Sequence, residues 1–219
     1  CALFLAVFSF SGQLPYNFQK ASILTYVIYL IARPVTQLYS TPEKSPITSW
    51  AYSILGQIYV VLPLALLGVW GYKSDYQLFM NTEYLLMALF VFVWTNDTGA
   101  YIVGCTLGKH RLFERISPKK SWEGFFGGLA FCIILASLAN YIIPGMLSTA
   151  QWIGMGILTS IFSTWGDLCE SLLKRTAGVK DSGKILPGHG GILDRFDSEL
   201  IASPVILIYP MLASASFLH

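Results

Sequence analysis

Residues 85–101 read LLMALFVFVWTNDTGAY, an apolar run that leads directly into an asparagine and an aspartate. A helix that crosses the hydrocarbon core of a bilayer needs about 20 mostly apolar residues, and this run belongs to a stretch of that length, 84–108. The whole chain is 54% apolar and 12% charged, whereas soluble domains carry about 25% charged residues. These features predict an all-α fold, a polytopic bundle of transmembrane helices.

Similar apolar stretches recur along all 219 residues. They predict about six to seven spans, near 21–39, 50–70, 84–108, 124–143, 151–173 and 198–218, with residues 1–12 as the end of another. The chain begins at Cys1 and not at a methionine, so we expect an N-terminal portion to precede it, which leaves the full number of spans open.

The chain divides into two parts by its chemistry. Residues 1–83 are poor in charge and predict an N-terminal transmembrane scaffold. Residues 84–219 hold nearly all the unusual polar residues. They predict a catalytic transmembrane part with two cytoplasmic loops, 109–123 and 174–197.

Lysine and arginine are concentrated on one side of the predicted bundle. If successive loops alternate between the two sides, the loops 33–49, 109–123 and 174–197 share a side. They hold twelve of the 14 basic residues: Arg33, Lys44, Lys109, Arg111, Arg115, Lys119, Lys120, Lys174, Arg175, Lys180, Lys184 and Arg195. Basic loops favour the cytoplasmic side, so we expect the site to face the cytoplasm from a bacterial-type inner or plasma membrane.

The predicted span 151–173 carries a polar stripe. Asp167, Glu170, Ser171 and Lys174 stand at helical spacings of three, four and seven, so they share one face. Ser160, Ser163 and Thr164 continue that face backwards. Because lipid cannot satisfy polar groups, the stripe predicts a bundle interior or a water-filled cleft.

Carboxylates outnumber every other candidate metal ligand in this part of the chain. The four cysteines form no CxxC pair, so neither a zinc site nor a disulfide framework is expected. Acids without a His/Cys ligand set favour a hard cation such as Mg²⁺, with Mn²⁺ as the alternative. The best candidates are Asp167, Asp194 and Asp197, with Asp97 and Asp181 behind them.

The surrounding cations and glycines suit a polyphosphate. Lys174, Arg175, Lys180, Lys184 and Arg195 can neutralise phosphate oxygens that a metal does not bridge. The glycines between 183 and 191 allow the backbone to approach phosphate closely. Each feature alone has a simpler explanation: a Lys-Arg pair can be a topology anchor, glycines a turn, and His189 a loop hydrogen-bonder.

Several motifs together resemble one known family. They are SLLKR at 171–175, KD at 180–181, PGHGG at 187–191, DRFD at 194–197, NDTGAY at 96–101, GK at 108–109 and SPKKSWEG at 117–124. This pattern is similar to that of the phosphatidate cytidylyltransferases, the CDP-diacylglycerol synthases, over residues 84–219. The resemblance implies that CTP and phosphatidate are converted to CDP-diacylglycerol and pyrophosphate.

The resemblance also implies roles for particular residues. Asp167, Asp194 and Asp197 would hold Mg²⁺ on the triphosphate. Lys174, Arg175, Lys180 and Arg195 would bind the phosphates and the departing pyrophosphate, while Lys119 and Lys120 would attract the phosphatidate headgroup or CTP. Asp97, Glu170, Ser171 and Asp181 would shape the site, and His189 could protonate the pyrophosphate.

Other functions stay open. A CDP-archaeol synthase or a polyprenol-type kinase would also use CTP, and a cation-coupled transporter would also carry acids in its membrane part. The acids here gather at one end and not at the midplane, and the chain shows no paired broken helices, which disfavours the transporter. The expected partners are CTP, phosphatidate, the lipid bilayer and, as an open alternative, a second copy of the chain, with no nucleic acid.

Overall fold

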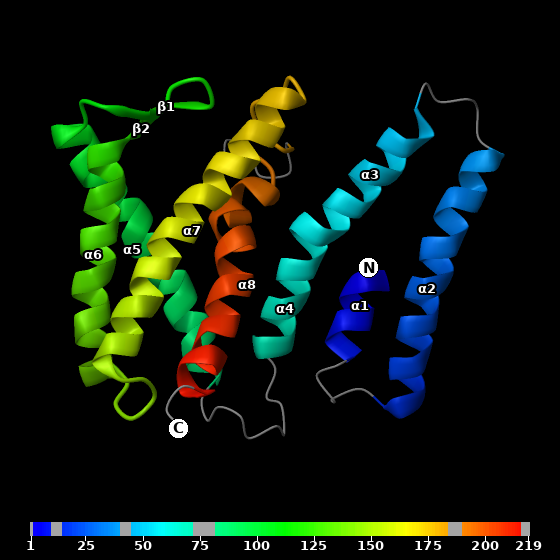
Figure 1. Cartoon of the computed structure of the whole chain (residues 1–219), viewed down its shortest axis with the longest axis horizontal. Helices are drawn as coiled ribbons and strands as arrows, with labels where there is room; N and C mark the ends of the chain where they lie inside the picture. Colours follow the sequence, from blue (N-terminus) through cyan, green and yellow to red (C-terminus); the bar gives the residue numbers. More distant parts are fainter. Residues whose placement is uncertain (1, 10–14, 40–44, 72–81, 184–189, 216–219) are drawn as a thin grey trace. The chain divides into compact units, whose positions relative to one another are not determined.

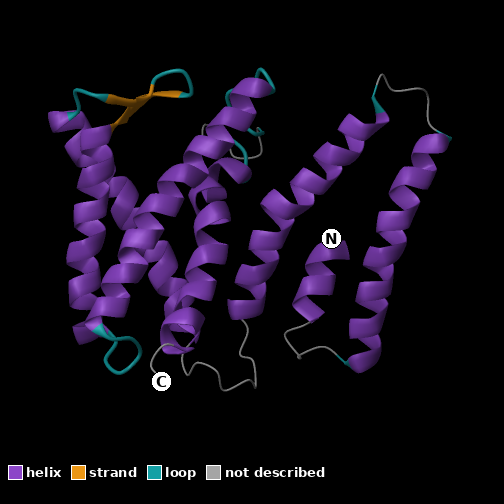
Figure 2. Cartoon of the chain, in the orientation of Figure 1, coloured by secondary structure: helices purple, strands orange, loops and turns teal. Residues whose placement is uncertain are grey.

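The computed structural model describes residues 2–9, 15–39, 45–71, 82–183 and 190–215. Helices make up nearly all of this part of the chain, and one short hairpin supplies the strands (Figure 2). The chain forms two compact units, residues 1–86 and 87–219. The expected helical class is confirmed.

The first unit is built from α1 (Ala2–Ser9), α2 (Tyr16–Leu38), α3 (Pro46–Gly56), the π-helical turn η1 (Gln57–Val61) and α4 (Leu62–Gly71). The helix α1 packs against α2 and α4. Large apolar side chains on α2 face outward, such as Leu24 (60% exposed) and Ile31 (61% exposed). Such a surface suits lipid and not water.

The π-helical turn accommodates a proline. In a regular α-helix the ring of Pro63 would collide with the carbonyl group four residues earlier. The structure avoids this with a wider turn, in which the Leu62 N–H reaches the carbonyl oxygen of Gln57, five residues back. The apolar stretch therefore continues as one nearly unbroken helical segment from Pro46 to Gly71.

The second unit contains most of α5 (Thr82–Leu107), followed by a hairpin of β1 (Arg111–Phe113) and β2 (Ser117–Ser121). Then come α6 (Trp122–Ile142), α7 (Thr149–Thr176) and α8 (Leu193–Ala215). The helix α7 packs against both α6 and α8, and the hairpin lies at the same end of the unit as the junction between α7 and α8 (Figure 1).

Glycines allow these helices to approach closely, as is common in membranes. A Cβ atom added at Gly127 of α6 would overlap Val103 of α5, and one at Gly156 of α7 would press on the Cys132 carbonyl of α6. At Gly166 of α7 the added atom would lie 2.6 Å from the Asp197 carbonyl oxygen on α8. The α7–α8 contact is therefore backbone against backbone, directly beside Asp167.

Four helical stretches are long and apolar enough to cross a membrane among the residues described: Tyr16–Leu38, Pro46–Val69, Tyr84–Leu107 and Trp122–Ile142. They match the expected spans 21–39, 50–70, 84–108 and 124–143 to within a few residues. The expected spans 151–173 and 198–218 coincide with the more polar helices α7 and α8. The chain is an integral membrane protein with several apolar helices.

The segment 109–123, predicted as a loop, contains the β1–β2 hairpin. Ser117 followed by Pro118 has the pattern of a helix start, but the structure places both in β2 and begins α6 at Trp122. Ser121 is the N-cap, and its hydroxyl accepts a hydrogen bond from the Gly124 amide at 3.1 Å. The proline at 118 is tolerated because a two-stranded hairpin consists only of edge strands.

Candidate active site

A cavity of about 260 Å³ opens in the second unit, among α5, the hairpin, α6 and α7. Its lining mixes four charged side chains with small and aromatic residues. The lining residues are Asn96, Asp97, Ala100, Tyr101, Gly104, Leu112, Lys119, Lys120, Ser121, Gly124, Phe125, Thr164 and Asp167. A partly polar hollow at one end of a membrane bundle is a common setting for a ligand site.

The charged residues of the lining, Asp97, Lys119, Lys120 and Asp167, are called the cavity cluster. The Lys120 ammonium contacts the Asp167 carboxylate at 2.5 Å, with side chains 26% and 32% exposed. The other Asp167 oxygen accepts a hydrogen bond from the Ser171 hydroxyl at 3.2 Å. The charges of Asp97 and Asp167 also interact across the cavity. These groups are accessible to a ligand.

A second group, called the loop cluster, ties the α7–α8 connection to α7. Its members are Glu170, Lys174, Ser182, Gly191 and Asp194. Asp194 accepts hydrogen bonds from the Lys174 ammonium at 2.8 Å, the Ser182 amide and hydroxyl, each at 2.9 Å, and the Gly191 amide at 2.7 Å. Both carboxylate oxygens are therefore engaged.

These contacts change the acidity of Asp194, which lies just before the predicted span 198–218. Burial by itself would raise the pKa of its carboxyl group, because it penalises the charged form. The hydrogen bonds from Lys174, Gly191 and Ser182 outweigh that effect and hold the pKa well below its usual range. Asp194 is thus a carboxylate that fixes the loop in place.

Glu170 is the most buried acid of the loop cluster, with its side chain only 1% exposed. The Lys174 ammonium lies 2.5 Å from one of its oxygens, one helical turn further along α7. Within the described part of the chain, this ion pair with Lys174 compensates the charge of the buried Glu170 carboxylate. Lys174 thus joins two acids, Glu170 and Asp194.

Asp197 lies between the two clusters. One of its oxygens accepts a hydrogen bond from the Ser198 amide at 2.7 Å, and its charge interacts with those of Asp167, Glu170 and Lys174. Its backbone is in contact with Gly166. The three acids predicted as metal ligands thus lie around the α7–α8 contact, but they are not equivalent.

The donor set can be tested against a divalent metal. No group of three His, Cys, Asp or Glu side chains within the described ranges is arranged to hold one. Asp167 and Asp197 still offer two neighbouring carboxylates of the kind that Mg²⁺ prefers. Asp194 would join them only by giving up contacts with Lys174 and Ser182. The acids fit a metal whose remaining ligands come from phosphate and water.

Four further predicted residues are exposed beside the loop cluster: Arg175 at the end of α7, Lys180 and Asp181 in the α7–α8 connection, and Arg195 in the first turn of α8. His189 and Lys184 lie outside the residues that the structure describes.

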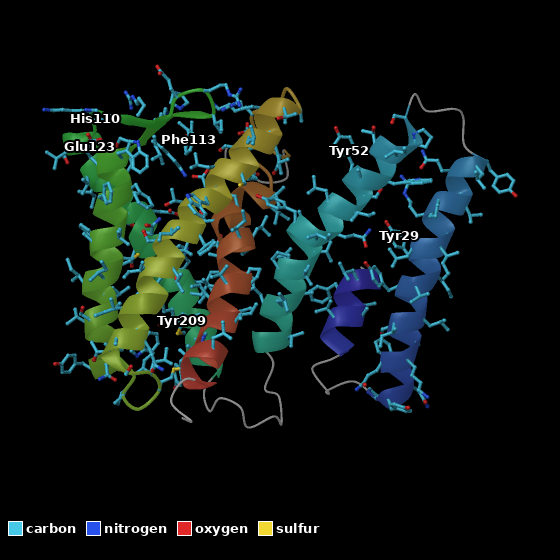
Figure 3. The ribbon with its side chains drawn as sticks, viewed as in Figure 1. Tyr29, Tyr52, His110, Phe113, Glu123 and Tyr209 are labelled. Carbon is cyan, nitrogen blue, oxygen red and sulfur yellow. The ribbon has the colours of Figure 1, made fainter. Side chains whose placement is uncertain are left out.

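Sequence reasoning did not single out the contacts that hold the hairpin. The Glu123 carboxylate accepts hydrogen bonds from the backbone amide of His110 at 3.2 Å and lies 2.6 Å from the Nδ1 atom of its ring. Figure 3 shows the two side chains together at the start of α6, with Phe113 further along the hairpin. This His110–Glu123 contact, called the hairpin lock, holds the hairpin that carries Lys119 and Lys120 against the start of α6. The sequence signal for this contact was Glu123, an acid in the first turn of α6.

Asn96 was also missed as a separate residue, although the NDTGAY motif contains it. It is 2% exposed, and its side chain bonds to three hydroxyl groups of α7. An amide inside an apolar run, together with a stripe of hydroxyls on another span, was the available signal.

The fold and the cavity together define a helical membrane protein with a hollow lined by paired acids and cations. Residues 1–213 match the model of the cytidylyltransferase family, and the chain belongs to that family. The match extends through the first unit as well as the second.

Individual proteins with a related sequence carry the same family assignment in their names. The chain is 41% identical over 158 residues to the phosphatidate cytidylyltransferase of Staphylococcus aureus (strain COL). It is 41% identical over 157 residues to that of Staphylococcus haemolyticus (strain JCSC1435) and 40% identical over 157 residues to that of Staphylococcus epidermidis (strain ATCC 12228 / FDA PCI 1200). Each alignment covers 72% of this chain and 60% of the relative.

Proposed function

We propose that the protein is a membrane nucleotidyltransferase of phospholipid biosynthesis that converts CTP and phosphatidate to CDP-diacylglycerol and pyrophosphate. The observation that carries the proposal is the cavity lined by Lys119, Lys120, Asp97 and Asp167, in which Asp167 also contacts Ser171 of the SLLKR motif on α7. The names of the relatives agree with it.

The reaction joins two anions, so charge neutralisation is its main requirement. An oxygen of the phosphatidate phosphate attacks the α-phosphorus of CTP, a new P–O–P bond forms, and the bond to the β-phosphate breaks to release pyrophosphate. A phosphomonoester has a second pKa of about 6, so the nucleophile needs no strong base. The residues therefore act by binding and orienting the phosphates.

Each cation has a place in this proposal. Lys119 and Lys120 would attract the phosphatidate headgroup or CTP at the cavity. Lys174, Arg175, Lys180 and Arg195 would bind the CTP phosphates and the departing pyrophosphate. Ser171 and Asp181 would help to shape the substrate site, and His189 could supply a proton to the pyrophosphate.

The acids would hold Mg²⁺, with Mn²⁺ as the alternative. Asp167 and Asp197 fit best, and Asp194 would contribute when its contacts with Lys174 and Ser182 rearrange. When bound, the metal would supply positive charge between phosphate oxygens. The residues of this chain would fix its place at the contact between α7 and α8.

The same proposal assigns an orientation. The hairpin and the α7–α8 connection carry most of the basic residues of the second unit, and basic ends favour the cytoplasmic side. The cavity would then face the cytoplasm, where CTP is dissolved, and the lipid headgroup would arrive from the inner leaflet.

One assay tests the function. Purified protein in detergent micelles receives CTP labelled on the α-phosphate, phosphatidate and Mg²⁺, and the lipid extract is scored for CDP-diacylglycerol. Matched reactions omit phosphatidate, replace it with diacylglycerol, or contain EDTA. We expect label in the lipid product only in the complete reaction, together with an equal amount of pyrophosphate.

The same reactions separate the alternatives. A polyprenol-type kinase would release CDP and leave the α-phosphate label in water. A CDP-archaeol synthase would prefer the ether-linked archaeal phospholipid precursor over phosphatidate. A transporter would form none of these products, and that outcome would refute the proposal. The mass of the protein–detergent complex would decide whether a second copy of the chain is a partner.

A further inference from the structure

A buried polar bridge connects two helices of the second unit. The Asn96 side-chain amide on α5 donates hydrogen bonds to the hydroxyl oxygens of Ser163 at 3.1 Å and Thr164 at 3.4 Å. Its carbonyl oxygen accepts one from the Ser160 hydroxyl at 2.7 Å. Asn96 is 2% exposed, Ser160 and Ser163 are 0% exposed, and Thr164 is 7% exposed. These four residues are called the Asn96 bridge.

The bridge is fixed from a third side. Gly128 of α6 lies so close to Asn96 that an added Cβ atom would be 2.5 Å from the side-chain oxygen and 2.7 Å from the backbone oxygen. The amide therefore has one available position, with the α6 backbone behind it and the α7 hydroxyls in front. A side chain packed in this way sets the distance between α5 and α7.

The place of the bridge connects it to the site. Asn96 directly precedes Asp97, and Thr164 stands three residues, almost one helical turn, before Asp167. Asn96 and Thr164 themselves line the cavity. The bridge is therefore an α5–α7 contact at the same cavity as the two acids, Asp97 and Asp167.

We propose that Asn96 is a positioning residue: through Ser160, Ser163 and Thr164 it sets the separation of the Asp97 and Asp167 carboxylates across the cavity. This inference rests on the proposed function, and it brings Asp97 into the ligand site beside Asp167. The ligand whose binding depends on that separation is a divalent cation with its phosphate partners.

The strength of the bridge suits positioning better than it suits holding the fold together. Single hydrogen bonds between membrane helices contribute little to stability. The hydroxyls that lose Asn96 can turn to their own helix, as Ser163 already does toward the Ser160 carbonyl at 3.3 Å. The helices should therefore survive a change at Asn96, whereas a small misplacement of catalytic groups can cost about 100-fold in rate.

The test compares Asn96→Ala with Thr159→Val. Thr159 is also fully buried on α7, but among the described residues its hydroxyl bonds only to the Met155 carbonyl of its own helix, at 2.8 Å. Both proteins are purified in detergent and assayed for kcat and for the KM of CTP. We expect kcat to fall by about tenfold or more in Asn96→Ala, with a small change in KM, and Thr159→Val to stay within about twofold of the unmodified protein.

A second measurement does not depend on turnover. Mn²⁺ is titrated into each protein without nucleotide or lipid, and the free ion is measured by electron paramagnetic resonance. Loss of a group that orients metal ligands weakens metal binding by about tenfold or more, so Asn96→Ala should bind Mn²⁺ correspondingly more weakly and Thr159→Val should not.

A mutant cycle shows whether Asn96 acts through α7. Its two changes are Asn96→Ala and the paired substitution Ser160→Ala, Ser163→Ala. If Asn96 acts through α7, combining both changes lowers kcat no further than Asn96→Ala alone. Should Asn96→Ala fail to elute as a folded species, the Ser160→Ala, Ser163→Ala protein carries both measurements with the same expected direction.

The outcomes separate the two proposals. Unchanged kcat and Mn²⁺ affinity in Asn96→Ala, or an equal effect of Thr159→Val, would overturn the positioning role and leave the proposed function intact. If the unmodified protein binds Mn²⁺ but forms no CDP-diacylglycerol, the function is wrong and the Mn²⁺ titration alone decides the role of Asn96. Absence of both activity and Mn²⁺ binding would overturn both proposals.

Discussion

The cavity cluster and the loop cluster contain the same kinds of side chain but use them differently. In the cavity cluster, Asp167 meets one cation and one hydroxyl, and its side chain is 32% exposed. In the loop cluster, Asp194 is 11% exposed, and four donors from three residues hold it. An acid with few partners beside a cavity can exchange them for a ligand, whereas a saturated acid mainly fixes the chain. Acids of the same type therefore differ in their surroundings: Asp167 borders the cavity, whereas Asp194 holds the α7–α8 connection.

The largest expected effect comes from Asp167→Asn, which removes the accessible charge from the cavity cluster. We expect CDP-diacylglycerol formation to fall by about 1,000-fold, a loss typical of a group that stabilises developing charge. The thermal unfolding midpoint in detergent should stay close to that of the unmodified protein. Glu114→Gln, an exposed acid on the hairpin, is the control and should keep full activity. Substantial turnover in Asp167→Asn would remove the distinction between the clusters.

Asp194→Asn should remove nearly all turnover, by about 100-fold or more, while the protein stays folded and inserted. Because Asp194 belongs to the loop cluster, the substitution should also loosen the α7–α8 connection, which loses the charged partner of Lys174. Limited proteolysis should cut the α7–α8 connection faster in Asp194→Asn than in Asp167→Asn. Equal cleavage rates would mean that Asp194 does not fix the loop, and retained activity would argue against Asp194 as a metal ligand.

Gly166→Ala tests the contact that brings Asp167 next to Asp197. The added methyl group would lie 2.6 Å from the Asp197 carbonyl oxygen and 2.9 Å from that of Ser198, so α7 and α8 must separate. Overpacking of this kind costs about 1–3 kcal/mol of stability. We expect a lower unfolding midpoint and about a tenfold loss of turnover, since small displacements reduce rates strongly.

Gly56→Ala is the matched control for that change, because nothing lies within 4 Å of the added atom. Its midpoint and activity should be unaltered. A normal midpoint in Gly166→Ala would show that the two helices can shift freely, and that the position of the acids does not depend on this contact.

The smallest effect is expected at the hairpin lock. His110→Ala removes the ring that contacts Glu123 but keeps the backbone amide contacts. The His110 side chain is 80% exposed, and exposed ion pairs contribute little. We expect a loss of only about twofold in kcat/KM, while Glu123→Ala, which removes all three contacts, should lose more. A larger effect of His110→Ala than of Glu123→Ala would contradict this description of the lock.

Much of the fold could be predicted from the sequence because membrane helices are read from apolar length. The expected span 124–143 and the helix Trp122–Ile142 nearly coincide, and Asp167, Glu170 and Lys174 share one face of α7 as their spacing predicted. The hairpin could not be predicted, because Ser117 and Pro118 have the local pattern of a helix start. Pairing between β1 and β2 overrides that local preference.

The sequence indicates which polar residues share a helix face, but it does not indicate which side chains contact each other. Spacing indicates which residues share a face, yet it does not decide whether Lys120 pairs with Asp167 or Lys174 with Asp194. Those choices depend on how the hairpin and α8 pack against α7, which spacing along the chain does not give. The partner of the hydroxyl stripe was unpredictable for the same reason, since Asn96 lies more than sixty residues away.

The tight fit of Gly128 behind Asn96 has a consequence for the history of the family. A methyl group at position 128 leaves no room for an amide at position 96, and a shorter side chain at 96 opens a hole behind it. Neither substitution is easily accepted while the other position stays as it is. Among homologous sequences, substitutions at positions 96 and 128 should therefore occur together, because the two residues share one packed space.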